Sequence, residues 1–155
     1  MKKQKLLIVV PSEVYGGGEV YIENLLNNEF FAERFEILLC SACERLNQKL
    51  VGFNTVKIKG SRSLSLSTFH NIRKINLLIR EFDPGAVLLN GLPEVGVYSN
   101  YFNHNKIICI GHSNEAWLGD SFYASPKRVI KNLITLNFWK GLHKFIAINN
   151  CVFEN

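Results

Sequence analysis

Short apolar runs alternate along the chain with longer stretches in which apolar residues recur every three or four positions. The run Leu6–Val10 is apolar at every position, which is typical of a strand buried on both faces of a parallel sheet. Such runs predict strands over 6–10, 35–40, 86–89, 106–110 and 145–148. The run 55–59 alternates polar and apolar residues, which predicts a strand nearer the sheet edge. Helical spacing predicts helices after the glycines at 16–18 and over 42–52, 67–82, 93–102 and 125–140.

The regular alternation of strands and helices indicates the fold class. Parallel strands joined through helices form right-handed crossovers, which give a sheet covered by helices on both faces. We therefore predict an α/β fold, a Rossmann-like doubly wound parallel sheet. A length of 155 residues predicts a single domain, 1–155.

The helix predicted over 67–82 has the clearest amphipathic pattern. Ser67 or Thr68 is expected to cap its start, and Asp83-Pro84-Gly85 is expected to end it. The apolar residues that should face the sheet are Phe69, Ile72, Ile75, Leu78, Ile79 and Phe82. The basic residues on the other face are Arg73, Lys74 and Arg80.

Composition indicates a globular protein, because 47% of the residues are hydrophobic and 20% are charged. No apolar run approaches the roughly 18 residues of a membrane-spanning helix. The basic N-terminus is followed by too short an apolar segment for a signal peptide, so we expect a cytoplasmic protein. The net charge of +5 favours an anionic partner. Nucleic acid is not expected, since basic residues are not clustered among aromatic ones.

Cysteine and histidine spacing gives no sign of a metal or a bound cofactor. Cys40 and Cys109 lie in apolar runs, where a free thiol behaves as a small hydrophobic side chain. Cys40 and Cys43 have CxxC spacing, but a zinc or redox site would need further ligands or an activating environment. We expect no metal and no cofactor, and no dinucleotide fingerprint follows the first strand.

Three glycines, Gly16, Gly17 and Gly18, separate the first strand from the first helix. In this layout, backbone N–H groups and a helix N-terminus face a ligand beyond the carboxyl end of the strand. Glycine also allows a ligand to approach the backbone closely. The alternative is a left-handed turn that simply joins strand to helix.

Polar residues and glycines are concentrated after four of the strands, where ligands bind in open parallel sheets. These segments are 11–18, 41–44, 90–94 and 111–117. His112 directly follows a buried strand and is the strongest single candidate, because histidine can hydrogen-bond a hydroxyl or a phosphate near neutral pH. It could instead cap a helix or bond a loop carbonyl.

Four motifs occur in one order: P-x4-GGGE at 11–19, LLNG at 88–91, ICIGH at 108–112 and FIAINN at 145–150. This ordered set resembles the N-terminal half of a retaining glycosyltransferase of family 4 (group 1), which has the GT-B fold. Asn149 stands where the family usually has a serine.

The resemblance implies transfer of a sugar from a nucleotide-sugar donor to a glycan or lipid-linked acceptor, in assembly of cell-surface polysaccharide or lipopolysaccharide. Gly16, Gly17 and Gly18 would approach the diphosphate and the reacting sugar of the donor, with Glu19 as the acidic residue that follows them. His112 would lie near the transferred sugar and serve as the catalytic candidate. The acceptor-side candidates are Asn90, Glu94, Ser113, Asn114 and Glu115.

The resemblance covers the acceptor-side domain, and the sequence lacks the EX7E carboxylates of the donor-binding C-terminal domain. We therefore expect this chain to be inactive alone and to need that second domain in cis or in trans. Alternatives are a non-catalytic binding or regulatory module, one subunit of a split glycosyltransferase, and a nucleotide-dependent oxidoreductase or flavodoxin-like domain.

The segment 125–145 carries Lys127, Arg128 and Lys131 among apolar residues. A basic amphipathic helix can make peripheral contact with the inner face of an anionic membrane. The alternative is an ordinary covering helix with a solvated face.

Overall fold

The structure is a computed structural model that describes residues 2–61, 65–91, 98, 101–111, 129 and 143–147, with only the backbone for 144–147. The strands of the described part of the chain are β1 (Gln4–Val10), β2 (Phe35–Ser41), β3 (Asn54–Lys57), β4 (Ala86–Asn90), β5 (Ile107–Gly111) and β6 (Lys144–Ala147). Its helices are α1 (Gly17–Leu26), α2 (Glu29–Arg34), α3 (Glu44–Lys49) and α4 (Leu66–Phe82).

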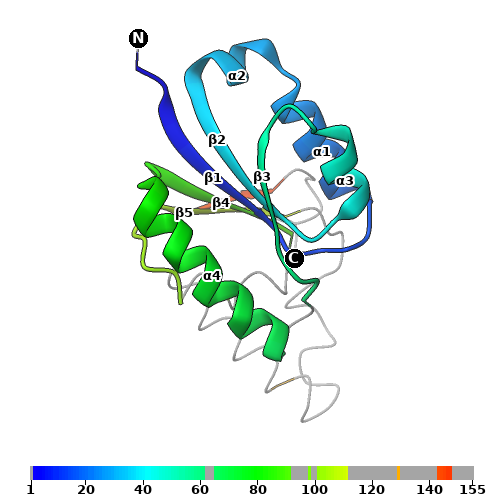
Figure 1. Ribbon diagram of the computed structural model, residues 1–155, viewed down its shortest axis with the longest axis vertical. Coiled ribbons are helices and arrows are strands. Elements are labelled where there is room, and N and C mark those ends of the chain that lie inside the picture. The colour runs from blue at the N-terminus through cyan, green and yellow to red at the C-terminus, as the bar shows by residue number, and fades with distance from the viewer. Residues whose placement is uncertain are drawn as a thin grey trace.

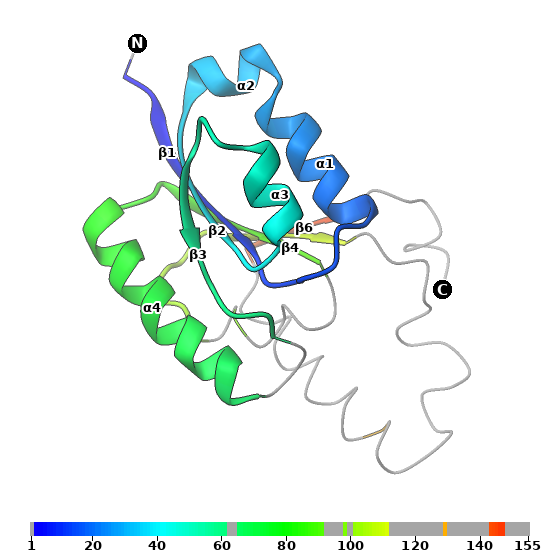
Figure 2. The same ribbon diagram turned by 45° about the vertical axis from the view of Figure 1, so that its right-hand side comes forward.

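All six described strands are parallel and form one sheet in the order β3-β2-β1-β4-β5-β6. The chain builds outward from β1 to β3 and then crosses back to β4, so the topological switch point lies between β1 and β4. Figures 1 and 2 show α1, α2 and α3 on one face of the sheet and α4 on the other. This arrangement confirms the predicted Rossmann-like, doubly wound α/β fold.

The side chains of β1 point alternately to the two faces of the sheet, and both faces are buried. Leu7 and Val9 pack with residues of α4, and Leu6, Ile8 and Val10 pack with residues of α1 and α3. From residue 6 to residue 10 neither face of β1 meets water, so polar residues have no place in this part of the strand. The unbroken apolar run of the sequence follows from this position.

The start of α4 differs from the prediction. Ser65 caps the helix, since its Oγ accepts the N–H of Thr68 at 3.2 Å, so Ser67 and Thr68 lie inside the helix. Asp83 ends it with φ of 49°, a left-handed conformation that precedes Pro84, as expected for this segment.

The predicted inward position of Phe69 is wrong, because this side chain is 48% exposed. At the first turns of α4, the buried positions belong to Thr68 and Asn71. Two polar residues therefore occupy the inner face, and an apolar pattern alone cannot locate that face here. The later part of the pattern is confirmed, with Ile72, Ile75 and Ile79 buried.

Other boundaries also differ. The sequence pattern does not predict α2, which Asn28 caps by accepting the N–H of Phe31 at 3.2 Å. The helix expected over 42–52 is confined to α3, and β3 is shorter than 55–59 but lies at the sheet edge, as predicted. Most of the helices expected over 93–102 and 125–140 lies outside the described residues.

Cys40, Cys43 and Cys109 are free thiols in the core. Burial raises the pKa of Cys40 and that of Cys109 to about 12, from 9.0. Thiols that remain protonated in this way are poor nucleophiles and poor metal ligands. The predicted role of Cys40 and Cys109 as small apolar side chains is confirmed by their burial.

We expect these buried thiols to make the fold sensitive to alkali. Unfolded cysteines ionise near pH 9 while the folded ones stay protonated, so the unfolded state binds fewer protons and the free energy of unfolding falls as pH rises. The loss between pH 8 and pH 10 is about 1.4 kcal/mol for each thiol. Urea unfolding at both pH values measures it. Between pH 8 and pH 10, the free energy of unfolding of the variant Cys40→Ala/Cys109→Ala should fall by about 3 kcal/mol less than that of wild type. An equal fall would show that these two thiols do not cause the sensitivity to alkali.

Candidate functional site

The candidate site lies at the carboxyl edge of the sheet, where β1 and β4 end side by side. Val9 pairs with Leu89 in the parallel register, so the segments that follow these two strands start from neighbouring positions. One segment passes through the glycines into α1, and the other begins at Asn90 and Gly91. This is the switch point of the sheet, where open α/β folds bind ligands.

The three glycines do not form the left-handed turn that was the alternative interpretation. Gly16 is the N-cap of α1 in an extended conformation, with φ of −131°, and Gly17 and Gly18 belong to the first helical turn. A Cβ placed on Gly17 would meet no described atom within 4 Å, and one on Gly16 would lie an ordinary 3.6 Å from Oε2 of Glu19. Neither strain nor crowding among the described residues therefore requires glycine at 16 or 17.

The first turn of α1 presents its backbone amides to this edge. The first helical hydrogen bond runs from the N–H of Val20 to the carbonyl of Gly16, at 3.0 Å. The N–H groups of Gly17, Gly18 and Glu19 precede it and have no acceptor within the helix. They point out of the helix N-terminus, where they can bind an oxygen atom of a ligand.

Glu19 joins the two sides of the switch point. Its carboxylate is buried, with 6% of the residue exposed. Oε2 accepts the N–H of Gly16 at 2.9 Å, and Oε1 accepts the side-chain amide of Asn90 at 3.3 Å. A buried carboxylate is stable only when donors such as these satisfy it. The bridge thus holds the start of α1 against the end of β4.

The charge of Glu19 affects which ligand suits this edge. A carboxylate in the first turn interacts favourably with the positive end of the helix dipole and offsets part of it. The N-terminus of α1 is therefore less favourable for an isolated anion than an uncompensated helix end would be. A hydroxyl-rich ligand such as a sugar can bond to the amides without adding negative charge beside the carboxylate.

Tyr15, which sequence analysis missed, anchors the loop just before the glycines. Its hydroxyl donates to Glu23 of α1, and Lys49 of α3 donates to both oxygens of the same carboxylate, at 2.8 and 3.0 Å. Arg45 lies 4.7 Å above the Tyr15 ring. Two hydrogen bonds lower the pKa of Glu23, and the one from Lys49 has a larger effect than the one from Tyr15. The bond to Glu23 in turn raises the pKa of Lys49. Two helices, α1 and α3, thus fix the position of this loop.

A second buried network supports the loop from the other face of the sheet. Asn71 of α4 donates to the carbonyl of Lys59 at 2.6 Å and to the hydroxyl of Tyr98 at 3.2 Å, and its Oδ1 accepts the N–H of Lys59 at 3.1 Å. Ser61 bonds to the same Tyr98 hydroxyl and donates its N–H to the carbonyl of Pro11 at 3.2 Å. Pro11 begins the segment 11–18, which we call the glycine loop. This network therefore connects α4 to the candidate site.

The structure brings together five of the predicted site residues. They are Gly16, Gly17, Gly18, Glu19 and Asn90. Gly111 ends β5 beside β4, and the candidates that follow it in sequence lie outside the described residues, as does Glu94. Those unplaced candidates are His112, Ser113, Asn114 and Glu115.

Two negative findings concern the described residues alone. Among them, no group of three histidine, cysteine, aspartate or glutamate side chains is placed to bind a metal ion. No helix within these residues combines the length and the apolar character needed to cross a membrane.

Two surface hollows lie away from this edge. One, of about 390 Å³, lies between α4 and residues 101–103, and the other, of about 530 Å³, lies between the start of β1 and α2. Neither is lined by a glycine-loop residue or by Asn90. The candidate site is therefore defined by the strand ends and by the hydrogen bonds that join them.

No protein-family model matches the chain, and no curated protein matches it. Among solved structures, a match is the crystal structure of a protein described as a UDP-N-acetylglucosamine 2-epimerase from Listeria monocytogenes. The TM-score is 0.61 and the sequence identity 16%, and the match covers 98% of this chain and 41% of that protein. The chain thus spans less than half of its structural neighbour. At this identity the likeness establishes the fold, a Rossmann-like domain of GT-B type, without singling out the family-4 glycosyltransferases.

Proposed function

We propose that this chain is the N-terminal, acceptor-side domain of a retaining family-4 glycosyltransferase. The reaction moves a sugar from a nucleotide-sugar donor to a glycan or lipid-linked acceptor in cell-surface polysaccharide or lipopolysaccharide assembly. The observation that supports this most strongly is the pair Gly16 and Gly17, whose missing side chains no described contact requires. Close approach of a ligand gives these glycines a function.

In the proposed reaction, the bond between the anomeric carbon and the diphosphate oxygen breaks, and the acceptor hydroxyl oxygen forms a bond to that carbon. The nucleoside diphosphate departs with the bonding electrons and takes up the proton that the acceptor hydroxyl loses. The amides at the start of α1 bind oxygen atoms of the reacting sugar, and the Glu19–Asn90 bridge holds those amides in place. A second domain, in cis or in trans, holds the nucleotide.

His112 is the proposed catalytic residue, as a hydrogen-bond partner of the transferred sugar. It follows Gly111, the last residue of β5, and β5 is the neighbour of β4 in the sheet. Glu94, Ser113, Asn114 and Glu115 are proposed acceptor contacts because they too follow strands that end at this edge. No metal or cofactor is part of the proposal.

A second candidate is isomerisation of a nucleotide sugar, which the likeness to the structure described as a 2-epimerase favours. The two reactions give different products. Transfer releases a nucleoside diphosphate and requires an acceptor, whereas epimerisation returns a nucleotide sugar of the same mass. A domain that only binds the ligand would give neither product.

The test uses the full-length gene product with a panel of nucleotide sugars, with and without glycan and lipid-linked acceptors. We expect acceptor-dependent release of nucleoside diphosphate and an acceptor heavier by one sugar, measured by mass spectrometry. His112→Ala should lower the transfer rate by about 100-fold, the usual loss when one positioned hydrogen-bonding group is removed. The exposed His70 on α4 gives the matched control, His70→Ala, which should retain full activity.

An epimer formed without transfer would favour the second candidate. Binding of a nucleotide sugar with neither product would indicate a non-catalytic module. Full activity of His112→Ala in an active enzyme would show that this histidine has a structural role.

A further inference from the structure

We propose that the outward face of α4 binds an anionic membrane surface, a role beyond sugar transfer and independent of it. Apolar and basic side chains share this face at three- and four-residue spacing, so they form one stripe along the helix. The members of this α4 stripe are Leu66, Phe69, Arg73, Leu77 and Arg80. All five side chains are exposed.

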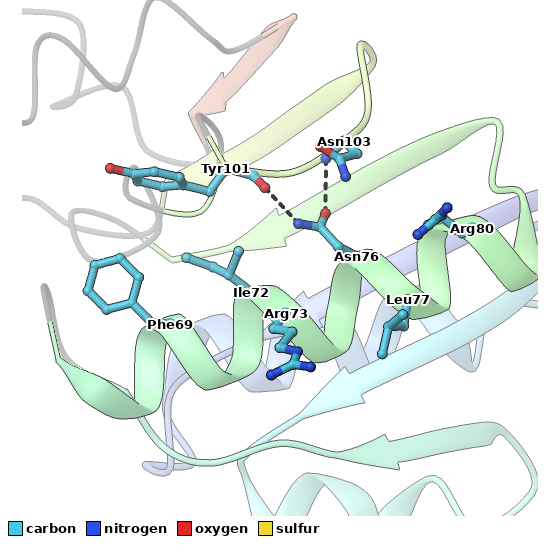
Figure 3. Close-up of a pocket in the computed structure, with 8 residues that line it drawn as sticks. All are labelled: Phe69, Ile72, Arg73, Asn76, Leu77, Arg80, Tyr101 and Asn103. Carbon is cyan, nitrogen blue, oxygen red and sulfur yellow. Dashed lines mark hydrogen bonds between the residues drawn. The ribbon is translucent and has the colours of Figure 1, made fainter.

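The apolar members of the stripe are unusually exposed for side chains of their size. Leu66 is 90% exposed and Leu77 is 51% exposed, and Phe69 with the nearby Tyr101 adds two half-exposed aromatic rings. Isolated surface leucines need no explanation, but a contiguous apolar group marks an interaction surface. Figure 3 shows Phe69 and Tyr101 at one end of the hollow beside α4, with Leu77 and Arg73 on the side of the helix opposite to Asn76.

The aromatic part of this surface is held in place before any partner binds. Asn76 donates to the carbonyl of Tyr101 at 2.8 Å and accepts the N–H of Asn103 at 2.9 Å, which fixes residues 101–103 against the helix (Figure 3). The rings of Phe69 and Tyr101 meet edge to face, with centroids 6.2 Å apart. Little conformational entropy is therefore lost by these two rings when the surface binds.

The charge of the stripe is positive and uncompensated within the described part of the chain. The two ion pairs found there join Lys49 to Glu23 and Lys57 to Glu44, so neither Arg73 nor Arg80 is paired. Glu81 is the one acidic residue of α4. Together with the net charge of +5, this favours an anionic partner.

The shape of the stripe favours a lipid surface over other anionic partners. Its basic and apolar side chains extend from Leu66 to Arg80, about 21 Å at 1.5 Å per residue. Leu66, 90% exposed, does not line the hollow. Among the described helices, α4 is the one that Figures 1 and 2 show on this face of the sheet, with Tyr98 and Phe102 packed beside it in the core. A second copy of the chain would bring arginines against arginines. An interfacial helix inserts leucine and aromatic side chains while its arginines reach lipid phosphates.

Binding in this way would place the carboxyl edge of the sheet near the membrane. The helix α4 follows β3, so Leu66 lies toward the same edge as the glycine loop. The hydrogen bond from Ser61 to Pro11 connects the approach to α4 with the start of that loop. A ligand anchored in lipid would then be presented beside the candidate site.

The experiment measures sedimentation of the full chain with vesicles of phosphatidylcholine alone and with roughly 30% phosphatidylglycerol, which supplies the negative surface potential. We expect binding only to the anionic vesicles, weakening as salt rises. Arg73→Glu/Arg80→Glu should lower the affinity by at least about 30-fold, since each cation near such a surface contributes about fivefold. Leu66→Ser/Leu77→Ser should remove the binding that persists in high salt. Lys2→Glu/Arg34→Glu, with the same change in net charge but placed near α2, should bind within about threefold of wild type.

Absence of wild-type binding to anionic vesicles would overturn the proposal, as would equal binding by the arginine variant. An equal loss in the control variant would show attraction by net charge alone and would also overturn it. Binding of an acidic amphipathic peptide without vesicle binding would assign the stripe to a protein partner. Sugar transfer to a soluble acceptor is read separately, so the two proposals can fail independently.

Discussion

Replacing Glu19 by alanine is expected to lower the free energy of unfolding by about 2–4 kcal/mol and the rate of sugar transfer by about 100-fold. The carboxylate is the described acceptor for the N–H of Gly16 and a partner of the Asn90 amide, and both donors are part of the candidate site. Without it, the start of α1 is released from the end of β4. Misplacement of binding groups by about 1 Å is enough for a rate loss of this size. Urea unfolding and transfer assays measure the two effects.

Exchanging the side chains of Glu19 and Asn90 distinguishes loss of the hydrogen bond between them from a general effect of substitution at either position. Glu19→Gln keeps one acceptor oxygen, but its new NH2 group faces either the N–H of Gly16 or the amide of Asn90, which are both donors. Asn90→Asp places two carboxylates together. Each single variant should be destabilised by about 1–3 kcal/mol. In the double variant Glu19→Gln/Asn90→Asp, the new amide can accept from Gly16 and donate to the new carboxylate, so the pattern of hydrogen bonds is restored. A coupling free energy of at least about 1 kcal/mol is expected, and additive losses would show that the bridge does not link the two sides.

Asn71→Ala is expected to lower the free energy of unfolding by about 3–5 kcal/mol, the largest stability effect that we expect outside the apolar core. Asn71 is fully buried, and its amide supplies the hydrogen bonds to the backbone of Lys59 and to the hydroxyl of Tyr98. Alanine leaves the partly buried N–H and carbonyl of Lys59 without these partners, and it removes one of two partners of the buried Tyr98 hydroxyl. Each group left unsatisfied costs about 1–3 kcal/mol. Urea unfolding monitored by circular dichroism measures the change.

Asn76 is the matched control for Asn71, since it lies on the same helix and also makes two hydrogen bonds to backbone groups, but near the surface. Asn76→Ala should be destabilised by no more than about 1 kcal/mol, because water can replace the lost partners. A loss in Asn71→Ala no greater than that in Asn76→Ala would contradict the structural role given to the buried network.

The α/β class could be predicted from sequence because β1 is buried on both faces and shows this in an unbroken apolar run. The inner face of α4 could be predicted only in part. Thr68 and Asn71 occupy buried positions there because their side chains bond to neighbouring groups, which a count of apolar residues does not reveal. The apolar pattern consequently places Phe69 on the wrong face.

The candidate site could also be predicted only in part from the sequence. The glycines and Asn90 could be predicted because they follow buried strands, where chain direction alone places them at one edge. Their contact through Glu19 depends on β1 and β4 being neighbours, which the order of elements in the sequence does not determine. Tyr15 and Lys49 both bond to Glu23 because α1 packs against α3, and no local sequence pattern predicts this contact.

The central claim is that the glycine loop faces the sugar, and substitution of Gly17 tests it most directly. Because a side chain at this position enters open space, Gly17→Ala and Gly17→Val should leave the free energy of unfolding within about 0.5 kcal/mol of wild type. In the full-length enzyme, we expect the transfer rate to fall by about 10-fold with alanine and by at least about 100-fold with valine, since the added carbons occupy the place of the sugar. Full transfer activity in a folded Gly17→Val enzyme would show that this loop does not face the ligand, and the account of the site would be wrong.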